Sequence, residues 1–253
     1  MPSLSRTVLL IFFVTAIPVC GQDHYSAVKS MTSAKSYAVQ TGKILEDSCE
    51  DGSSLVDKML AASFNLNDYS SDYEMLVYKD NQIIKETGTI YFSKPRLFRV
   101  EVKTGPKSGS LAILASDAKV HGHLGGVLKY FWSSVSSDSS LVRAINDYPM
   151  VDADFYSLVK YLKNMLKHGN SSLKTREAVL TAITNNPVYI LDMYTINHAN
   201  PEKKRLLLKR IYVDPKTFLP VFWQDYIDGK LWSQSSWYNL RNNLNLPADT
   251  FKT

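Results

Sequence analysis

Two closely spaced histidines come nearest, in type and spacing, to a metal site in this 253-residue chain. His121 and His123 are separated by one glycine, so in a strand both imidazoles point to the same face, and Asp117 lies nearby. Zinc sites use three or four ligands at recognisable spacings, and no third spaced ligand accompanies this pair. We therefore predict no metal and no other cofactor. A metal-dependent hydrolase is the weakest of three functional hypotheses.

Nucleophilic catalysis also lacks a signature in this sequence. Serine, histidine and aspartate are present, but no Gly-x-Ser-x-Gly motif places a serine on a nucleophile elbow. Cys49 lies among four acidic residues at positions 46–51, and their negative charges disfavour the reactive thiolate. We expect a protein that is not an enzyme, in which Cys49 is either a bystander or a partner in an intermolecular disulfide.

Residues 1–21 have the layout of a cleavable signal peptide. An apolar run follows Arg6, and Val19 and Gly21 are small enough for the two positions that signal peptidase recognises, which places the cut after Gly21. The run is shorter than the about 20 residues that a membrane-spanning helix needs. An exported, periplasmic protein is expected. Secretion, or a lipid anchor on Cys20, is less favoured, because lipoprotein signals usually have a small residue just before the cysteine and here Val19 stands there.

Removal of the signal peptide leaves one cysteine, Cys49, so no intrachain disulfide is expected. The remaining chain is long enough to bury a substantial core as one domain.

The formal net charge of +5 is spread along the chain, and the one dense basic run is at residues 203–205. This run is typical of a solvated strand edge. It could also attract an anionic membrane surface or an acidic partner. No recognition helix accompanies it, so we do not expect nucleic acid as a partner.

The hydrophobic pattern divides the mature chain into a polar leader at residues 22–54, with weak helical spacing, and a domain at residues 55–253. Apolar residues at spacings of three and four predict helices at 54–66 and 152–167. Elsewhere the apolar residues alternate, as in strands with one buried face. Strands are expected at 73–78, 83–92, 97–102, 111–115, 119–123, 179–184, 188–197, 206–214, 219–228 and 230–240.

Turn residues join several of these strands directly. Asp80-Asn81 and Asp228-Gly229 are typical of two-residue hairpins, and Pro215 follows Asp214 at a favoured turn position. The glycine- and serine-rich segment 124–140 is expected to be mainly loop. The sheet should therefore be antiparallel, ending in a three-stranded meander.

Three segments carry a recognisable pattern: Gly88-Thr-Ile-Tyr-Phe-Ser-Lys-Pro-Arg-Leu-Phe-Arg-Val-Glu101, Ile211-Tyr-Val-Asp-Pro-Lys-Thr-Phe-Leu-Pro-Val-Phe-Trp223 and Asn245-Leu-Pro-Ala-Asp-Thr-Phe251. They resemble the periplasmic lipoprotein-carrier superfamily typified by LolA and LolB. Leu124-Gly-Gly126 and Arg143-Ala-Ile-Asn-Asp-Tyr-Pro149 are similar to an uncharacterised bacterial domain family within that superfamily. In element order, the resemblance covers residues 55–252.

The resemblance implies an α+β, mainly β fold: a strongly curved antiparallel sheet that forms an unclosed β-barrel, capped by helices. An apolar cavity between sheet and cap would hold acyl chains of a lipid or an acylated protein. The protein would act as a monomeric carrier or chaperone with transient contact to a membrane or membrane protein. The residues expected to border the cavity are Phe98, Val100, Leu111, Ile113, Phe131, Trp132 and Trp223.

Two basic residues correspond to the latch that the resemblance implies. The family has an arginine before the proline of the strand turn, which is thought to hold the helical cap closed, and here that residue is Lys94. Because lysine offers one compact charge instead of a planar fork of donors, a latch to helix carbonyls would be weaker. Arg99 occupies the aromatic-arginine position and is a second candidate, although a solvent-facing strand residue would also fit the pattern.

The leading hypothesis is thus an exported lipid or lipoprotein carrier. The second is an envelope sensory or protein-interaction module with the same fold, which would bind another protein through its cavity or sheet edge.

Overall fold

The computed structural model describes residues 52–167, 171–179, 187–195 and 206–252. The expected signal peptide with Cys20, and the leader up to residue 51 with Cys49, lie outside these residues. None of the described helices combines the length and hydropathy of a membrane span.

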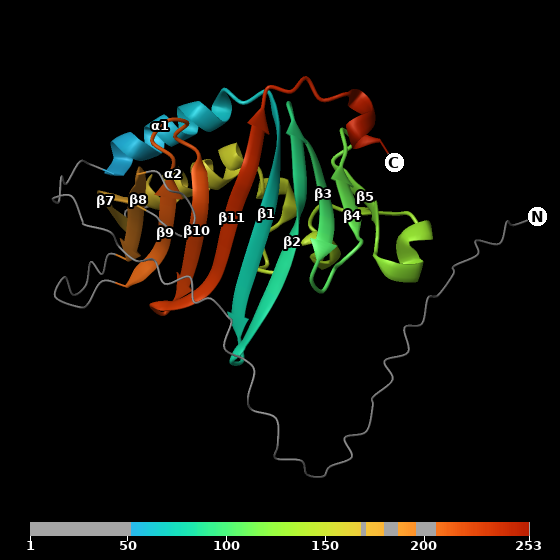
Figure 1. Ribbon diagram of the computed structural model, residues 1–253, viewed down its shortest axis with the longest axis horizontal. Helices are drawn as coiled ribbons and strands as arrows, with labels where there is room; N and C mark the ends of the chain where they lie inside the picture. Colours follow the sequence, from blue (N-terminus) through green and yellow to red (C-terminus); the bar gives the residue numbers. More distant parts are fainter. Residues whose placement is uncertain (1–51, 168–170, 180–186, 196–205, 253) are drawn as a thin grey trace, which may run out of the picture. The chain divides into compact units, whose positions relative to one another are not determined.

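Among the described residues, eleven strands form one antiparallel sheet in the order β6-β5-β4-β3-β2-β1-β11-β10-β9-β8-β7. The edge strands β6 and β7 do not pair with each other, so the sheet is open (Figure 1). The strands are β1 (Asp68–Lys79), β2 (Gln82–Ser93), β3 (Leu97–Thr104), β4 (Leu111–Leu114), β5 (Lys119–His123), β6 (Ser133–Ser136), β7 (Ser171–Val179), β8 (Pro187–Thr195), β9 (Leu207–Val213), β10 (Pro220–Ile227) and β11 (Lys230–Asn242).

Two of the predicted hairpin turns have the backbone conformation that their residues favour. Asp80 and Asn81, between β1 and β2, have positive φ angles of 50° and 60°. Asp228 and Gly229, between β10 and β11, have φ angles of 50° and 73°. Positive φ at both central positions gives a turn whose twist matches that of the flanking strands, and Asp, Asn and Gly tolerate it best. These turns confirm the antiparallel hairpins and the final meander β9-β10-β11.

The first and last strands of the domain lie side by side at the centre of the sheet. β1 pairs with β11, where Tyr73 faces Trp237. Two runs of antiparallel strands, β1 to β6 and β7 to β11, therefore meet along one central ladder.

Two helices cover one face of the sheet, here called the inner face (Figure 1). They are α1 (Gly52–Phe64) and α2 (Phe155–Lys167), and they contact each other. Their apolar stripes bury Met59 from α1 and Leu162 from α2 completely, in one core cluster with inner-face residues such as Leu191. Both helices were expected from their spacing, α1 beginning two residues earlier and α2 three residues later than predicted.

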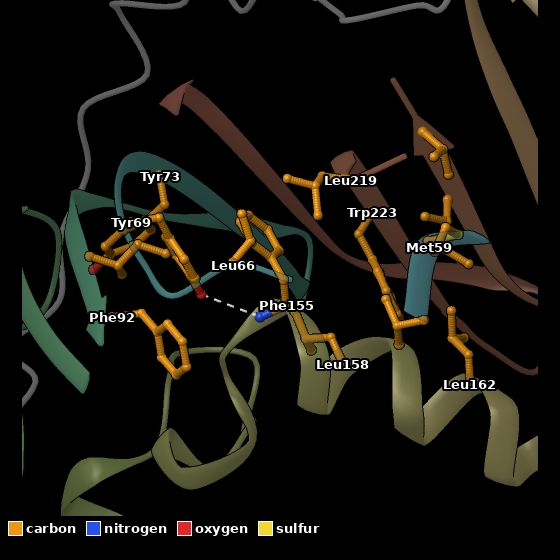
Figure 2. Packing of buried hydrophobic residues seen from close by; sticks show 14 of the residues in the cluster. Met59, Leu66, Tyr69, Tyr73, Phe92, Phe155, Leu158, Leu162, Leu219 and Trp223 are labelled. Carbon is orange, nitrogen blue, oxygen red and sulfur yellow. Dashed lines mark hydrogen bonds between the residues drawn. The ribbon is translucent and has the colours of Figure 1, made fainter. Parts of the chain in front are cut away.

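The start of α2 is fixed by polar contacts to its own first turn and to the sheet. Asp154 accepts hydrogen bonds from the Ser157 amide (3.0 Å) and the Ser157 hydroxyl (2.6 Å), as an N-cap does. The Phe155 amide donates to the Tyr69 hydroxyl of β1 at 3.3 Å, the dashed line in Figure 2. Figure 2 also shows Phe92 and Leu158 on the two sides of this junction. The predicted boundary at residue 152 was wrong because residues Met150–Asp152 form a separate 3-10 turn.

Both edge strands differ from the prediction. β7 spans Ser171–Val179, where no strand was predicted, and of the strand expected at 179–184 only Val179 lies within the described residues. β6 lies in a serine-rich segment expected to be loop. Each pairs with one neighbour only, and edge strands tolerate polar residues that weaken the hydrophobic alternation on which the prediction depended.

Candidate functional site

A cavity of about 210 Å³ lies under the inner face of the sheet. It is lined mostly by apolar side chains from eight strands, from α2 and from the segment before α2. The apolar wall includes Met75, Ile90, Phe98, Val100, Val102, Leu111, Ala112, Val120, Leu124, Val135, Leu141, Val142, Met150, Leu158, Trp223 and Trp237.

Strand register accounts for the wall on β2 to β5. Ile90 pairs with Val100, which pairs with Ala112, which pairs with Gly122, and all four border the cavity. Residues directly opposite in an antiparallel ladder point to the same face, so one row of the sheet forms this surface.

The cavity requires the sheet to curve strongly. It contacts Val135 of β6 and Trp223 of β10, which are seven strands apart in the sheet order. At about 4.8 Å per strand, a flat sheet would separate these strands by roughly 34 Å. The β2–β3 pairing shifts register between Thr87 and Gly88, and such an irregularity bends a sheet locally. Glycine is needed at position 88, because a Cβ there would lie 2.2 Å from the Glu101 carbonyl oxygen.

Four of the seven residues expected to border the cavity lie in its wall. They are Phe98, Val100, Leu111 and Trp223. Phe98 and Trp223 are buried, whereas Val100 and Leu111 are half-buried. Whether they contact a ligand remains a prediction.

Ile113 lies on the other face of the sheet, outside the cavity wall. It is fully buried and pairs with Arg99, whereas its neighbours Ala112 and Leu114 belong to the inner face and pack in the core cluster. Strand alternation explains the difference, because adjacent residues in β4 point to opposite faces. Its expected place in the cavity was therefore wrong.

Phe131 and Trp132 also lie outside the cavity, with 71% and 45% of their surfaces exposed. They follow a 3-10 turn, Gly126–Tyr130, that connects the edge strands β5 and β6. Because no further strand pairs beyond β6 among the described residues, this turn has no sheet surface against which to bury its side chains. The apolar sequence predicted burial, but the edge position leaves the side chains exposed.

Lys94 does reach the end of a cap helix. Its Nζ donates to the backbone carbonyl of Phe64, the last residue of α1, at 2.5 Å and lies 4.8 Å from the centre of the Phe64 ring. A cation is favourable here because the last carbonyls of a helix are unpaired and carry partial negative charge. The contact is a single exposed hydrogen bond, as expected for lysine in place of arginine.

Arg99 contacts the C-terminal segment and not the helical cap. Its guanidinium donates to the Thr250 carbonyl at 2.8 Å and pairs with Glu101 at 2.6 Å. Thr250 belongs to a 3-10 turn, Ala248–Phe251, whose Phe251 side chain is buried. Arg99 therefore fastens this turn to the outer face of β3, opposite the helices.

Within the described residues, the two histidines have separate partners. His121 Nε2 lies 3.1 Å from Asp117 Oδ2, while His123 Nδ1 lies 3.1 Å from the Leu124 carbonyl oxygen and its ring packs edge-on against Trp132. Among the residues that the structure describes, no three potential ligands lie close enough to hold a metal ion.

Sequence reasoning missed the polar groups of the cavity. Glu86 of β2 is only 3% exposed, and its Oε1 accepts a hydrogen bond from the Tyr73 hydroxyl at 3.1 Å. Burial raises the pKa of the Glu86 carboxyl, whereas the bond from Tyr73 and the charge of Lys107 act in the opposite direction. The available signal was position: Glu86 is two and four residues from Gly88 and Ile90, so alternation places it on the inner face.

A second carboxylate at the cavity, Asp225, is already fully engaged. It forms an ion pair with Lys209 and accepts hydrogen bonds from Trp223 Nε1 and the Ser233 hydroxyl, both at 3.0 Å. The Lys209 ammonium also lies 5.4 Å from the centre of the Tyr161 ring. This group is therefore a structural link between β9, β10 and α2.

The open antiparallel sheet and the helices on its inner face match the architecture that the resemblance implied, whereas the cavity is covered mainly by the segment before α2 and by Leu158 of α2. No family model and no curated protein matches the sequence.

Several solved structures are similar to this chain. A DUF1329 family protein from Desulfovibrio piger is 14% identical over 80% of this chain and 98% of that chain, with a TM-score of 0.36. A LolA superfamily protein from Nitrosomonas europaea is 10% identical over 81% and 98%, with a TM-score of 0.39. The MucA/MucB complex of Pseudomonas aeruginosa contains a chain that is 10% identical over 80% of this chain and 60% of that one, with a TM-score of 0.43.

Proposed function

We propose that this protein is an exported carrier that holds an acyl chain of a lipid or acylated protein in its cavity. The observation that carries the proposal is the apolar cavity of about 210 Å³ between the curved sheet and its cover. Apolar cavities of about 150 Å³ already bind molecules as large as benzene. A segment of acyl chain is a ligand of suitable shape and polarity for this wall.

Apolar burial alone would supply useful affinity. Each methylene removed from water contributes about 0.8 kcal/mol, so about eight buried methylenes would contribute roughly 6 kcal/mol before the entropic costs of binding. This apolar contribution is the same whatever the polar end of the ligand.

The cover over the cavity consists of residues 141–153 and Leu158 of α2. Few polar contacts hold this cover and its neighbouring helices in place. Lys107 Nζ donates to the carbonyls of Leu141 (3.3 Å) and Arg143 (2.5 Å), and both of these residues line the cavity. Lys163 of α2 pairs with Asp57 of α1 at 2.7 Å, which joins the two helices. Exposed pairs of this kind contribute only about 0–1 kcal/mol each, so ligand entry would not require disruption of the core.

An exposed apolar loop at the cavity supports transient contact with an anionic membrane surface. Val127, Tyr130 and Phe131, in the loop at residues 124–132, are 82%, 75% and 71% exposed. Leu124 of the same loop lines the cavity. Exposed aromatic and apolar side chains beside lysine are typical of segments that enter the membrane interface.

The charges around this loop have the sign that an anionic bilayer would attract. Between Asp117 and Asp138 the sequence contains two lysines, Lys119 and Lys129, and no acidic residue. A bilayer surface is therefore the occupant that we propose for the loop.

Cosedimentation with vesicles tests the membrane contact. The mature protein should bind vesicles containing phosphatidylglycerol more strongly than vesicles of phosphatidylcholine, and the Tyr130→Ser/Phe131→Ser variant should lose most of that binding. Ile83→Ser is a matched control, because Ile83 is 58% exposed near the distant β1–β2 turn. Equal loss in the control, or dimerisation through the loop without vesicle binding, would refute the membrane contact.

Native mass spectrometry of the mature protein, purified gently from an exporting host, tests the carrier function. A stoichiometric adduct that organic extraction identifies as a lipid or acylated peptide would support it. A ligand-free mass that phospholipid or lipopeptide does not change would favour the protein-interaction module.

A further inference from the structure

Two buried oxygen atoms at the cavity have no hydrogen-bond partner within the described part of the chain. They are Glu86 Oε2 and the Tyr148 hydroxyl, and both residues line the cavity. A buried polar atom without a partner costs about 1–3 kcal/mol, and more when it carries charge. Such atoms in a cavity wall therefore indicate where a ligand's polar group would be stabilised.

Glu86 is the stronger of the two indications. Oε1 accepts from Tyr73, so that oxygen is satisfied by β1, whereas Oε2 is left for a donor from the cavity. Its pairing partner across the ladder is Met75, which cannot supply one. The carboxylate is therefore held in position by its own sheet but incompletely paired.

The basic residues of the cavity wall are engaged with other groups. The Lys107 ammonium donates to the Leu141 and Arg143 carbonyls. The Arg143 guanidinium donates to the Asp147 carbonyl at 3.0 Å and lies 3.5 Å from the Asp147 carboxylate. Neither cation donates a hydrogen bond to Glu86, so within the described residues Glu86 Oε2 is an acceptor without a donor.

Tyr148 adds a neutral polar contact in the same wall. Burial raises the pKa of its hydroxyl well above the ordinary value, so the group stays protonated and can donate or accept. Its ring packs edge-on against Tyr161 of α2, with centroids 6.3 Å apart, which holds the side chain in place.

We propose that the cavity selects amphiphiles whose head group donates hydrogen bonds to Glu86, with an ammonium preferred to an amide or hydroxyl and a carboxylate or phosphate disfavoured. This inference rests on the carrier function proposed above and adds the chemical class of the ligand's polar end. The carboxylate would repel an anionic head, and burial would strengthen the repulsion. An ammonium would compensate the buried charge best, because it supplies both donors and opposite charge.

A competition experiment with probes of equal chain length tests the selectivity. The environment-sensitive apolar fluorophore N-phenyl-1-naphthylamine is bound to the mature protein at pH 7. It is displaced by dodecylamine, dodecanamide, dodecanol or laurate, each below its critical micelle concentration. Dodecylamine should displace the fluorophore at a concentration at least tenfold lower than laurate, with the amide and alcohol between them.

Variants assign that preference to the two side chains. Glu86→Gln should reduce the advantage of dodecylamine over laurate to threefold or less, with each displacement referred to the affinity of that variant for the fluorophore. Tyr148→Phe should weaken the amide and alcohol about threefold while sparing the amine. Glu74→Gln is the matched control, because Glu74 lies on β1 with its side chain on the opposite face, paired with Lys85, and it should change none of these ratios.

The outcomes separate this inference from the carrier function. If the fluorophore binds and all four amphiphiles displace it equally, or laurate is preferred, the head-group inference is overturned and the carrier function stands. If neither the fluorophore nor any amphiphile binds to a folded protein, both proposals are wrong. Thermal melts of each variant establish folding, and Glu86→Leu provides a second test should Glu86→Gln bind the fluorophore poorly.

Discussion

The inner face of the sheet has a solid side at β8 and β9, where the side chains are fully packed, and a hollow side at β3 and β4, where they border the cavity. In β8 and β9, Leu191, Met193 and Ile211 have no exposed surface, and they pack in the cluster that includes residues of α1 and α2. In β3 and β4, Val100 and Ala112 continue the same inner face but are half-buried and line the cavity. Figure 1 shows both helices lying behind β7 to β10. The strands thus provide one continuous apolar surface. Where the helices pack against it the surface is core, and where they do not it lines the cavity.

The largest expected effect is a difference in the free energy of unfolding when leucine is replaced by alanine on each of the two sides. Leu191→Ala should lower the free energy of unfolding by about 2–5 kcal/mol, because it opens a void in a fully packed region. Leu111→Ala should cost about 1 kcal/mol or less, because Leu111 is half-buried and already borders a cavity. Urea denaturation of both variants measures the difference. Equal costs would show that the two sides are packed alike.

Enlarging a side chain sharpens the comparison. Ala112→Phe should fill part of the cavity and weaken binding of N-phenyl-1-naphthylamine at least tenfold, with a small change in stability, because free volume is available there. Val213→Phe on the solid side has no such volume and should destabilise the protein by about 1–3 kcal/mol while sparing binding. Fluorescence titration and urea denaturation distinguish the two. Undiminished binding in Ala112→Phe would exclude this cavity as the site.

The Lys94 contact should affect ligand release more than stability. Lys94→Met removes the hydrogen bond to the Phe64 carbonyl, which as an exposed contact contributes about 0.5–1 kcal/mol. We expect the fluorophore to dissociate several-fold faster in stopped-flow measurements. Lys94→Arg is the control and should release it no faster than the natural protein. Unchanged dissociation in Lys94→Met would mean that α1 does not move when ligand leaves.

The smallest expected effect concerns the outer face, where Asp72 of β1 is linked to β2, β3 and β11. Hydrogen bonds from Asn239 (3.0 Å), Lys103 (2.9 Å) and Thr89 (2.7 Å) lower the pKa of its carboxyl to about 2. Because the folded-state pKa is below the unfolded value of about 3.9, this stabilisation is present above pH 4 and is lost as the pH falls towards 2.

Asp72→Asn should therefore make stability less dependent on pH between 4 and 2, with ligand binding unchanged at pH 7. Urea midpoints across that range compare the variant with the natural protein. An identical pH dependence in the two proteins would show that Asp72 does not contribute.

Local chemistry made much of the fold predictable from the sequence. Both two-residue hairpins follow from residues that tolerate positive φ, and both helices follow from apolar stripes. The wall residues Phe98 and Val100 follow from clean alternation in β3.

The remaining features depend on contacts between distant parts of the chain. Ile113 was misplaced because its face depends on the register of β4 against β3, and Arg99 binds Thr250, 151 residues away. Phe131 is exposed because it lies beside a sheet edge, which a sequence does not reveal. Glu86 was overlooked because a carboxylate in an alternating strand ordinarily lies on the solvent-exposed face, whereas Glu86 lies on the buried inner face.

The central ladder between β1 and β11 also sets the order in which a chain that emerges amino end first can fold. Such a chain presents β1 long before residues Lys230–Asn242 arrive to pair with it. Throughout that interval one side of β1 is an unpaired strand edge, and the apolar inner face is not yet continuous. The central ladder can form only after nearly the whole domain has emerged. The period of greatest exposure to aggregation and proteolysis therefore coincides with the emergence of the chain.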